Sequence, residues 1–515
     1  MKFLFRRRLV KDLQFEAAND QRLRRVLGPI NLTALGIGAI IGGGIFSLSG
    51  VIAAQYAGPA AVLSFVIAGI ASVLAALCYS EFASVVPLSG SAYTYGYATL
   101  GEFVAWIIGW DLVLEYAVGA ITVSISWSGY VLSLINDMGV HLPQAVASVA
   151  AATGTKLIDI PDATAAVAHV PRGWQVFDAL LAGHLTSGGV DPATLVQVTT
   201  LFNLPAAIIV LLISALLIVG AKESAGFNNG IVVLKLAVLL LFIGGTVAAV
   251  KMSNWQPFFP EGEGHGVFGW SGVMRGAGLA FFAYIGFDAV STAAQEAKNP
   301  QRDVPIAIFA SLLICTVLYI AVAGVMTGVV NYKQLSVPDP IALVANYAGM
   351  KWMGTFIKVG AIIGLSSVVL VMLYGQSRVF FSMARDGLLP PFVQHVHPRF
   401  RTPWITTAVT AVLVSIFASM LKLSEAGDLC SIGTLLAFVI VSVGILALRV
   451  RHPELKPAFR TPAVWFVAPA GALSALYLMV SLPGKTWVRL LIWLAIGLVI
   501  YFGYSAKHSH LAKKD

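Results

Sequence analysis

Charged side chains are scarce in this chain. Only 11% of its 515 residues are charged and 58% are hydrophobic, whereas a soluble globular protein carries about 25% charged residues. This scarcity excludes an ordinary soluble domain and predicts a polytopic membrane protein. Cysteine is also rare, since the chain has 3 cysteines without paired spacing. They indicate neither a disulfide framework nor a metal site.

Apolar runs make up most of the sequence. Twelve of them approach or exceed the length of about 20 residues that crosses a bilayer. An even number of spans places both termini on one side of the membrane. We therefore expect an all-α polytopic membrane protein. The runs are residues 29–52, 60–87, 102–134, 199–220, 229–250, 276–297, 305–330, 353–383, 404–421, 430–448, 463–482 and 488–505.

The positive charges predict the orientation. Two thirds of the 33 Lys and Arg residues lie in segments that face the cytoplasm if the N-terminus is inside, and Lys and Arg concentrate on that side of membrane proteins. Both termini are then cytoplasmic, in a multi-pass protein of the cell membrane. A basic interfacial helix is predicted over residues 5–28, within the N-terminal segment 1–28. The net charge of +9 is assigned to topology and anionic lipid, not to nucleic acid.

The first apolar run is interrupted by glycine. Five glycines stand among the nine residues 36–44, and each costs about 0.5–1 kcal/mol in a helix interior relative to Ala. A helix broken inside a bilayer exposes polar backbone groups, which is tolerated where they line a site. The freed amides of Gly42, Gly43 and Gly44, at a helix N-terminus, suit a carboxylate. The alternative is close helix packing through small residues.

A second interruption occurs five spans later. Residues 276–292 combine glycines with an acid, Asp288, in an apolar run. Carbonyl groups freed at Phe282, Ala283 and Ile285 would receive an ammonium group, so that both interruptions together bind a zwitterion. Asp288 is expected to cap the second half-helix, either as part of the site or as a purely structural cap.

Two broken spans at corresponding positions indicate an inverted-repeat transporter with its site at the midplane. The first repeat is expected over residues 29–250 and the second over 251–450. Residues 451–505 form two peripheral spans, and 506–515 form a cytoplasmic tail. An insertion at 134–198, outside the membrane, is expected either to fold as a small cap or to remain mobile.

Two acids lie four residues apart in the third span, which places them on one face of a helix. Asp111 and Glu115 fall near the middle of the bilayer, where an ionisable group is a functional candidate by default. The alternative is a protonated or hydrogen-bonded structural carboxyl group.

Lys235 lies within the fifth span. A buried lysine that takes up and releases a proton would couple transport to a proton gradient, with the proton as coupling ion and no other cofactor. The alternative is that its side chain snorkels to the cytoplasmic surface. Met372, in the eighth span, either fills the core or limits the side-chain pocket.

Four segments of the chain resemble the amino acid/polyamine/organocation transporter superfamily, and within it the cationic amino acid transporter group and its bacterial relatives. Any one segment is weak evidence, but the set in order with twelve spans is specific. The segments are GAIIGGGIF at 38–46, FAYIGFD at 282–288, KNPQRDVP at 298–305 and RDGLLP at 385–390.

The resemblance implies a five-plus-five inverted-repeat core with discontinuous first and sixth helices and two extra helices. It also implies proton-coupled or facilitated transport of amino acids, and it assigns roles to matching residues. Ile40, Ile41, Gly42, Gly43 and Gly44 would bind the substrate carboxylate; Phe282, Ala283 and Ile285 the amino group; Asp111 and Glu115 would act near the side-chain end; Met372 would line the pocket; and Lys235 would occupy the coupling-ion position.

One position departs from the family pattern, because Gly43 replaces the usual Ser or Thr. With Met372 narrowing the pocket, small neutral L-amino acids are favoured as substrates, carried by proton symport. Uptake or exchange of arginine and lysine is the alternative. An intramembrane enzyme using Asp111 and Asp288, or a channel, is less favoured. A small accessory membrane subunit is a further open possibility.

Overall fold

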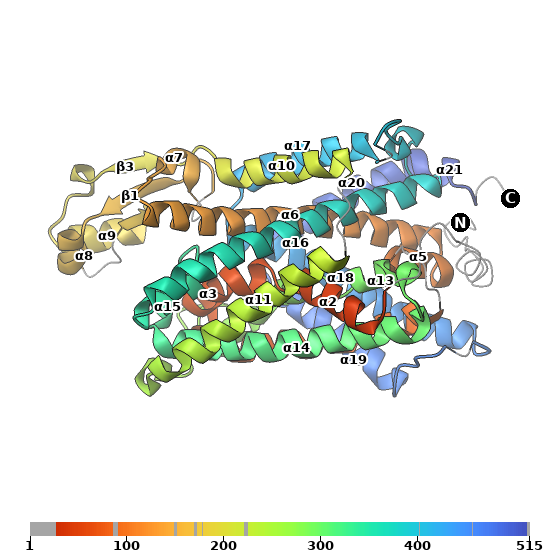
Figure 1. Cartoon of the computed structure of the whole chain (residues 1–515), viewed down its shortest axis with the longest axis horizontal. Coiled ribbons are helices and arrows are strands. Elements are labelled where there is room, and N and C mark those ends of the chain that lie inside the picture. The colour runs from red at the N-terminus through yellow and green to blue at the C-terminus, as the bar shows by residue number, and fades with distance from the viewer. Residues whose placement is uncertain are drawn as a thin grey trace.

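The computed structural model describes residues 27–85, 91–148, 152–168, 173–177, 179–220, 225–400, 402–455 and 457–511. The interfacial helix predicted over 5–28 therefore lies outside the described residues, apart from its last two. Over the described ranges the chain is largely helical (Figure 1).

The elements of the first half of the chain are α2 (Pro29–Ile40), η2 (Gly44–Leu48), α3 (Ser49–Val51), η3 (Ile52–Ala57), η4 (Gly58–Ala60), α4 (Ala61–Val85), α5 (Ser91–Thr99), α6 (Glu102–Asp137), α7 (Gln144–Ala147), β1 (Lys156–Ile160), α8 (Asp162–Ala168), β2 (Gly173–Val176), α9 (Ala179–Ser187), η5 (Pro192–Thr194), β3 (Gln197–Thr199), α10 (Leu204–Val219), α11 (Ala225–Thr246), η6 (Val247–Ala249) and η7 (Met252–Trp255). The elements of the second half are α12 (Gly269–Ala280), η8 (Phe281–Tyr284), α13 (Ala289–Thr292), η9 (Ala294–Glu296), α14 (Pro300–Val329), η10 (Tyr332–Gln334), α15 (Pro340–Tyr347), α16 (Lys351–Arg385), η11 (Pro391–Gln394), α17 (Trp404–Met420), α18 (Leu423–Arg451), α19 (Val464–Ser481), α20 (Gly484–Ile500), η12 (Tyr501–Ser505) and α21 (Ala506–His508).

Among the described residues, 9 helices are long and apolar enough to cross a membrane, and three shorter apolar helices accompany them. The shorter ones are α2, α10 and α17. Each apolar run predicted from the sequence overlaps helical residues. The boundaries differ in places, because α12 begins at Gly269 and α18 at Leu423, both seven residues before the predicted starts. Arg275, which precedes the run predicted at 276–297, is therefore helical.

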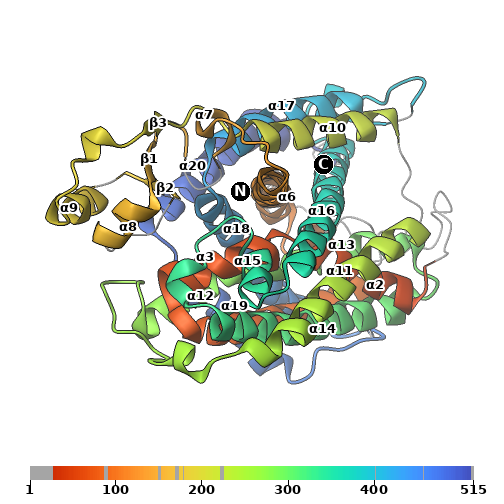
Figure 2. The same cartoon turned by 60° about the vertical axis from the view of Figure 1, so that its left-hand side comes forward.

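Eight of the apolar helices form two groups. The first contains α2, α4, α12 and α14, which pack on one another, and the second contains α6, α10, α16 and α17. Both α11 and α18 contact members of each group. Figure 2 views the helices more nearly end-on, with α6 between α16 and α18. One hydrophobic core includes residues of both groups.

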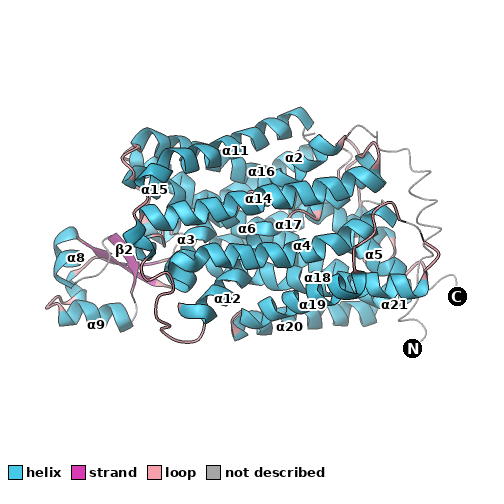
Figure 3. Ribbon diagram, turned by 90° about the horizontal axis from the view of Figure 1, so that it is seen from below, coloured by secondary structure: helices cyan, strands magenta, loops and turns pink. Residues whose placement is uncertain are grey.

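The insertion after α6 folds as a small cap at one end of the molecule, as one of the two expected alternatives. Strand β1 pairs antiparallel with β2 on one side and β3 on the other. The sheet and helices α8 and α9 enclose a separate apolar core that includes Ile158, Ile160 and Leu185. Figures 1 and 3 place this cap at the end opposite to α5 and α21.

The C-terminal segment is fastened to the other end of the bundle. Ser505 donates a hydrogen bond to the carbonyl oxygen of Leu388 at 2.6 Å. The hydroxyl groups of Ser509 and Tyr97 both donate to the carboxylate of Glu102, which is fully buried. Ser505 and Ser509 thereby bind the C-terminal segment to the loop after α16 and to the start of α6.

Candidate functional site

The first break in a helix lies at Ile41 and Gly42, as the glycine-rich sequence predicts. Helix α2 ends at Ile40, Ile41 has an extended backbone with ψ 97°, and helical structure resumes at Gly43 and Gly44 with wide π-type turns. Within the described chain, the amides of residues 42–45 donate to no backbone or side-chain acceptor. These amides stand at the start of a helical segment, where the helix dipole favours an anion.

The second break covers residues 285–288. Ile285 has ψ 136° and Gly286 has φ +116°, which favours glycine because a side chain is strained there. A Cβ atom on Gly286 would also lie 2.9 Å from the carbonyl carbon of Ala39. Of the three predicted acceptors, Ile285 receives no hydrogen bond among the described residues. Phe282 accepts from the Ile285 amide at 3.2 Å, and Ala283 from the Tyr319 hydroxyl at 3.0 Å.

The two breaks touch each other. A Cβ atom on Gly44 would overlap the Cα atom of Ala283, so no larger residue fits there without separating the two broken helices. Both segments are buried. The structure therefore brings the predicted amide donors and carbonyl acceptors together in one buried region.

Lys235 does not snorkel. Its side chain is 0% exposed, and its Nζ atom donates a 2.7 Å hydrogen bond to the carbonyl oxygen of Gly38. Gly38 is in the last turn of α2, where carbonyl groups lack helical partners and attract a cation. The aliphatic part of the side chain packs on Gly364 of α16, where an added Cβ would lie 3.0 Å from the Lys235 Cε atom. Lys235 thus links α11 to the first break and to α16.

Asp111 and Glu115, the two predicted carboxyl groups of α6, are buried. Both side-chain oxygens of Asp111 and one oxygen of Glu115 have no hydrogen-bond partner within the described ranges. Asp288 stands at the N-cap position of α13, but its side chain makes no capping hydrogen bond. Asp288 thus stands at the predicted cap position, and its capping role stays a prediction. The carboxylate accepts from the hydroxyl group of Tyr116, at the long distance of 3.4 Å.

Met372 lies against the same helix. Its side chain is buried, and a methyl group on Gly119 would lie 3.2 Å from its sulfur atom. Gly119 follows Glu115 by one helical turn, so Met372 packs on α6 one turn from Glu115. The sequence alternatives of core filler and pocket wall both agree with this position.

Sequence reasoning missed three hydroxyl groups beside the breaks. Tyr319 on α14 donates to the carbonyl oxygens of Ile40 at 2.9 Å and Ala283 at 3.0 Å. Tyr130 on α6 donates to the carbonyl oxygen of Phe46 at 2.7 Å. The Oγ atom of Ser126 lies 2.7 Å from where a Cβ atom of Gly43 would be. The signal available in the sequence was a hydroxyl group in a long apolar run, which is too common to identify a site.

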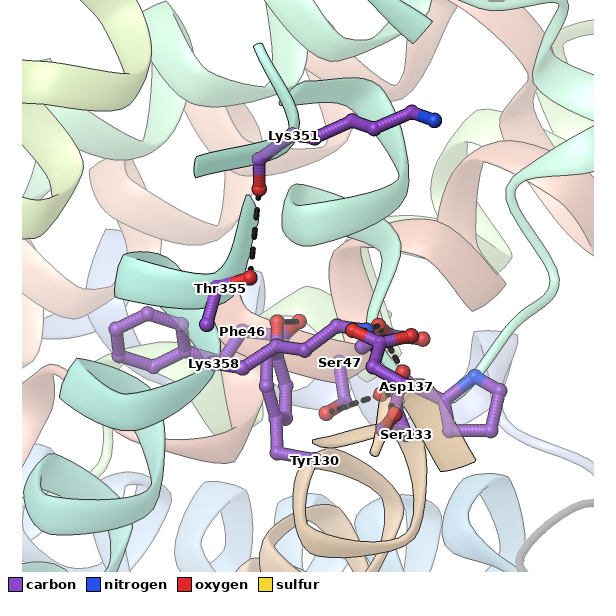
Figure 4. Close-up of polar contacts among 10 residues, drawn as sticks. Phe46, Ser47, Tyr130, Ser133, Asp137, Lys351, Thr355 and Lys358 are labelled. Carbon is purple, nitrogen blue, oxygen red and sulfur yellow. Dashed lines mark hydrogen bonds and ion pairs between the residues drawn. The ribbon is translucent and has the colours of Figure 1, made fainter. Parts of the chain in front are cut away.

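Polar contacts close the bundle at the end that carries the cap (Figure 4). Lys358 of α16 is buried, with its Nζ atom 2.6 Å from Asp137 and 3.6 Å from Asp339. Ser133 donates to Asp339 at 2.6 Å, and Ser47 donates to the carbonyl oxygen of Pro338 at 3.1 Å. The loop before α15 is thereby held between η2 and α6. Burial raises the pKa of Asp339, while the Ser133 hydrogen bond and the Lys358 charge act in the opposite direction.

Ion pairs also connect sequence-distant helices on both sides of the breaks. Arg275 of α12 and Asp428 of α18 are buried and lie 2.5 Å apart. Toward the termini, the guanidinium group of Arg449 donates two hydrogen bonds to Glu81, at 2.7 and 2.8 Å. Residues 41–46 and 281–288 are buried.

The comparisons with known proteins agree with this geometry. Residues 27–505 match the family described as Amino acid permease. A branched-chain amino acid permease of Bacillus subtilis, BcaP, is 45% identical over 509 residues, which cover 99% of each chain. A methylthioribose transporter of the same organism is 42% identical over 513 residues, covering 100% of each chain.

More distant relatives come from plants and animals. The vacuolar cationic amino acid transporter 4 of Arabidopsis thaliana is 33% identical over 465 residues, covering 89% of this chain and 69% of that relative. The family match spans nearly the whole chain and includes both breaks. The chain therefore belongs to the amino acid permease family, as a relative of the cationic amino acid transporter group in the amino acid/polyamine/organocation superfamily.

Proposed function

We propose that the protein is a secondary active permease that carries L-amino acids across the cell membrane by alternating access. The observation that carries this proposal is the contact between two broken helices, one with unpaired amide groups at its break and the other with carbonyl groups. Unpaired amides at residues 42–45 suit the substrate carboxylate, and the carbonyl groups of Ile40, Ala283 and Ile285 suit its ammonium group. A zwitterion supplies both charges at the required short separation.

The proposed fold has twelve membrane spans, with repeats at 29–250 and 251–450 and peripheral spans α19 and α20. Both termini are cytoplasmic in this proposal, and the cap faces outward. The two helix groups then supply the moving parts, with α2, α4, α12 and α14 rocking against α6, α10, α16 and α17. The contacts of Lys358 and Glu81 close the outer and inner ends.

Proton coupling is proposed to run through Lys235. The charged lysine caps the C-terminal end of α2 through the carbonyl group of Gly38, and loss of its proton weakens that cap. Protonation would therefore favour one arrangement of α2 against α11 and α16, and release of the proton would favour the other.

Small or branched neutral amino acids are the proposed substrates. Met372 supports this choice because its buried side chain limits the space beside Gly119. A relative of 45% identity is named for branched-chain amino acids. Arginine and lysine are the second candidates, because the unpaired oxygens of Asp111 and Glu115 would attract a cationic side chain.

The experiment is uptake of a labelled amino acid into proteoliposomes, with competition by a panel of unlabelled compounds, with and without an inward proton gradient. Saturable uptake that L-valine and L-leucine inhibit, with accumulation driven by the gradient, is the expected result. The panel includes methylthioribose, which has neither a carboxylate nor an amino group. Competition by methylthioribose alone would contradict recognition of a zwitterion.

A further inference from the structure

Tyr319 connects the two broken helices through a single hydroxyl group. Its oxygen atom lies 2.9 Å from the carbonyl oxygen of Ile40 and 3.0 Å from that of Ala283. Ile40 ends the first half of one broken helix, and Ala283 lies near the end of the first half of the other. The side chain that makes both contacts comes from a third helix, α14.

The hydroxyl group carries one proton and must serve two acceptors. Carbonyl groups at helix ends have no helical partner, and these two are buried away from water. One shared proton leaves the pair with capacity for further donors, since each carbonyl oxygen has two lone pairs. An ammonium group, with three donors, matches that remaining capacity.

The ring of Tyr319 has little freedom to move. It is fully buried and makes edge contacts with Tyr284, at a centroid distance of 5.4 Å, and with Phe65, at 5.8 Å. These contacts fix the position of the hydroxyl oxygen. The two carbonyl oxygens are consequently held at a set separation and orientation, independently of the ligand.

We propose that Tyr319 is a positioning residue for the ligand's ammonium group, because it holds the carbonyl groups of Ile40 and Ala283 as a preorganised pair of acceptors. The inference rests on the proposed function and deepens it. A preorganised pair of acceptors spares the ligand the cost of ordering them. The contribution therefore applies to ligands that carry an amino group and is absent for ligands that lack it.

The test compares two ligands that share a carboxylate and a side chain. L-Valine has an ammonium group, and 2-hydroxyisovalerate has a hydroxyl group in its place. In Tyr319→Phe, which keeps the ring contacts, we expect inhibition constants for L-valine to rise roughly three- to tenfold, as for loss of one hydrogen bond. Those for 2-hydroxyisovalerate should change by less than about twofold.

Tyr284→Phe is the matched control, because it removes a buried hydroxyl group of the same aromatic cluster. That hydroxyl group donates to the carbonyl oxygen of Phe65, at 2.8 Å, and not to Ile40 or Ala283. We expect it to affect both ligands equally or neither. An equal change for both ligands in Tyr319→Phe, no change, or tighter binding of L-valine would overturn the inference.

Failure of this inference is distinguishable from failure of the proposed function. If the wild-type protein binds L-valine no better than 2-hydroxyisovalerate, zwitterion recognition itself is wrong. If the wild-type protein prefers L-valine and Tyr319→Phe keeps the same preference, only the role of Tyr319 is wrong.

Discussion

The Nζ atom of Lys235 lies 2.7 Å from the carbonyl oxygen of Gly38 and joins the middle of α11 to the last turn of α2. A charged donor at that helix end is favoured by the helix dipole. The contact is therefore stronger with the charged amine, and Gly38 lies three residues before the first break.

Replacing this lysine removes the proton-dependent contact. In Lys235→Met, which keeps much of the apolar volume, we expect substrate accumulation driven by a pH gradient to fall to the level reached without the gradient. Uptake by proteoliposomes with an imposed gradient measures this. Lys333→Met, at an exposed lysine on η10, is the control. Undiminished accumulation in Lys235→Met would show that coupling runs elsewhere.

Ser126 of α6 lies beside the space that a side chain at position 43 would occupy. A Cβ atom on Gly43 would lie 2.7 Å from the Oγ atom of Ser126, so the two positions cannot both carry side chains without a shift. We expect Gly43→Ser to cost about 1–3 kcal/mol of stability, as for overpacking, and to reduce uptake. Adding Ser126→Ala should restore much of both. Thermal unfolding in detergent and uptake assays measure the effects, and a double variant no better than Gly43→Ser would contradict this account.

Met372 is expected to limit the size of the substrate. Met372→Ser removes most of the side chain beside Gly119, so bulkier or cationic amino acids should compete roughly tenfold better, within the range that pocket contacts supply. The measurement is the competition profile against labelled uptake. Met353→Ser, at a buried methionine elsewhere on α16, is the control. An unchanged profile in Met372→Ser would leave this side chain as core filling.

The Arg275–Asp428 pair predicts non-additive stability changes. Among the described residues, Nη1 of Arg275 and Oδ1 of Asp428 have no hydrogen-bond partner, so one contact joins the pair. Arg275→Met strands a buried carboxylate and should cost about 3–5 kcal/mol. Arg275→Met with Asp428→Leu should recover most of that loss. The measurement is the unfolding midpoint of the single and the double variant. An equal loss of stability in both would contradict the prediction.

Asp339 predicts a pH dependence outside the membrane spans. Burial raises the pKa of this carboxyl group, so the folded protein keeps the proton to a higher pH than the unfolded chain. The stabilisation is complete below the ordinary Asp pKa of about 4 and is lost as the pH rises through the raised value. The melting temperature of the wild type, relative to Asp339→Asn, should fall as the pH rises above about 4. A constant difference across that range would contradict the assignment.

The sequence predicted the breaks because their cause is local. Glycine destabilises a helix wherever it stands, and residues 36–44 concentrate it. The sequence also suggested a buried Lys235 as one alternative, but it did not identify Gly38 as the partner. A hydrogen bond between α11 and α2 depends on how the two helices pack, and the sequence does not show that packing.

The features that sequence reasoning missed depend on pairs of distant residues. Arg275 lies just before the apolar run at 276–297, and its partner Asp428 is 153 positions away in the sequence. Tyr319 looked like an ordinary aromatic residue of α14, since its two acceptors lie on other helices. Asp288 stands at the predicted cap position, but the contact of its side chain with Tyr116 was not predicted.

The C-terminal segment is attached to the rest of the bundle, which matters for protein engineering. Ser505 and His510 contact the end of α16 and the loop after it, and Ser509 contacts Glu102. A fluorescent reporter joined directly behind Leu511 would pull on the segment that is bound to the loop after α16 and to the start of α6. An affinity tag or reporter at this end consequently requires a long, flexible spacer if transport rates of the fusion are to represent those of the untagged protein.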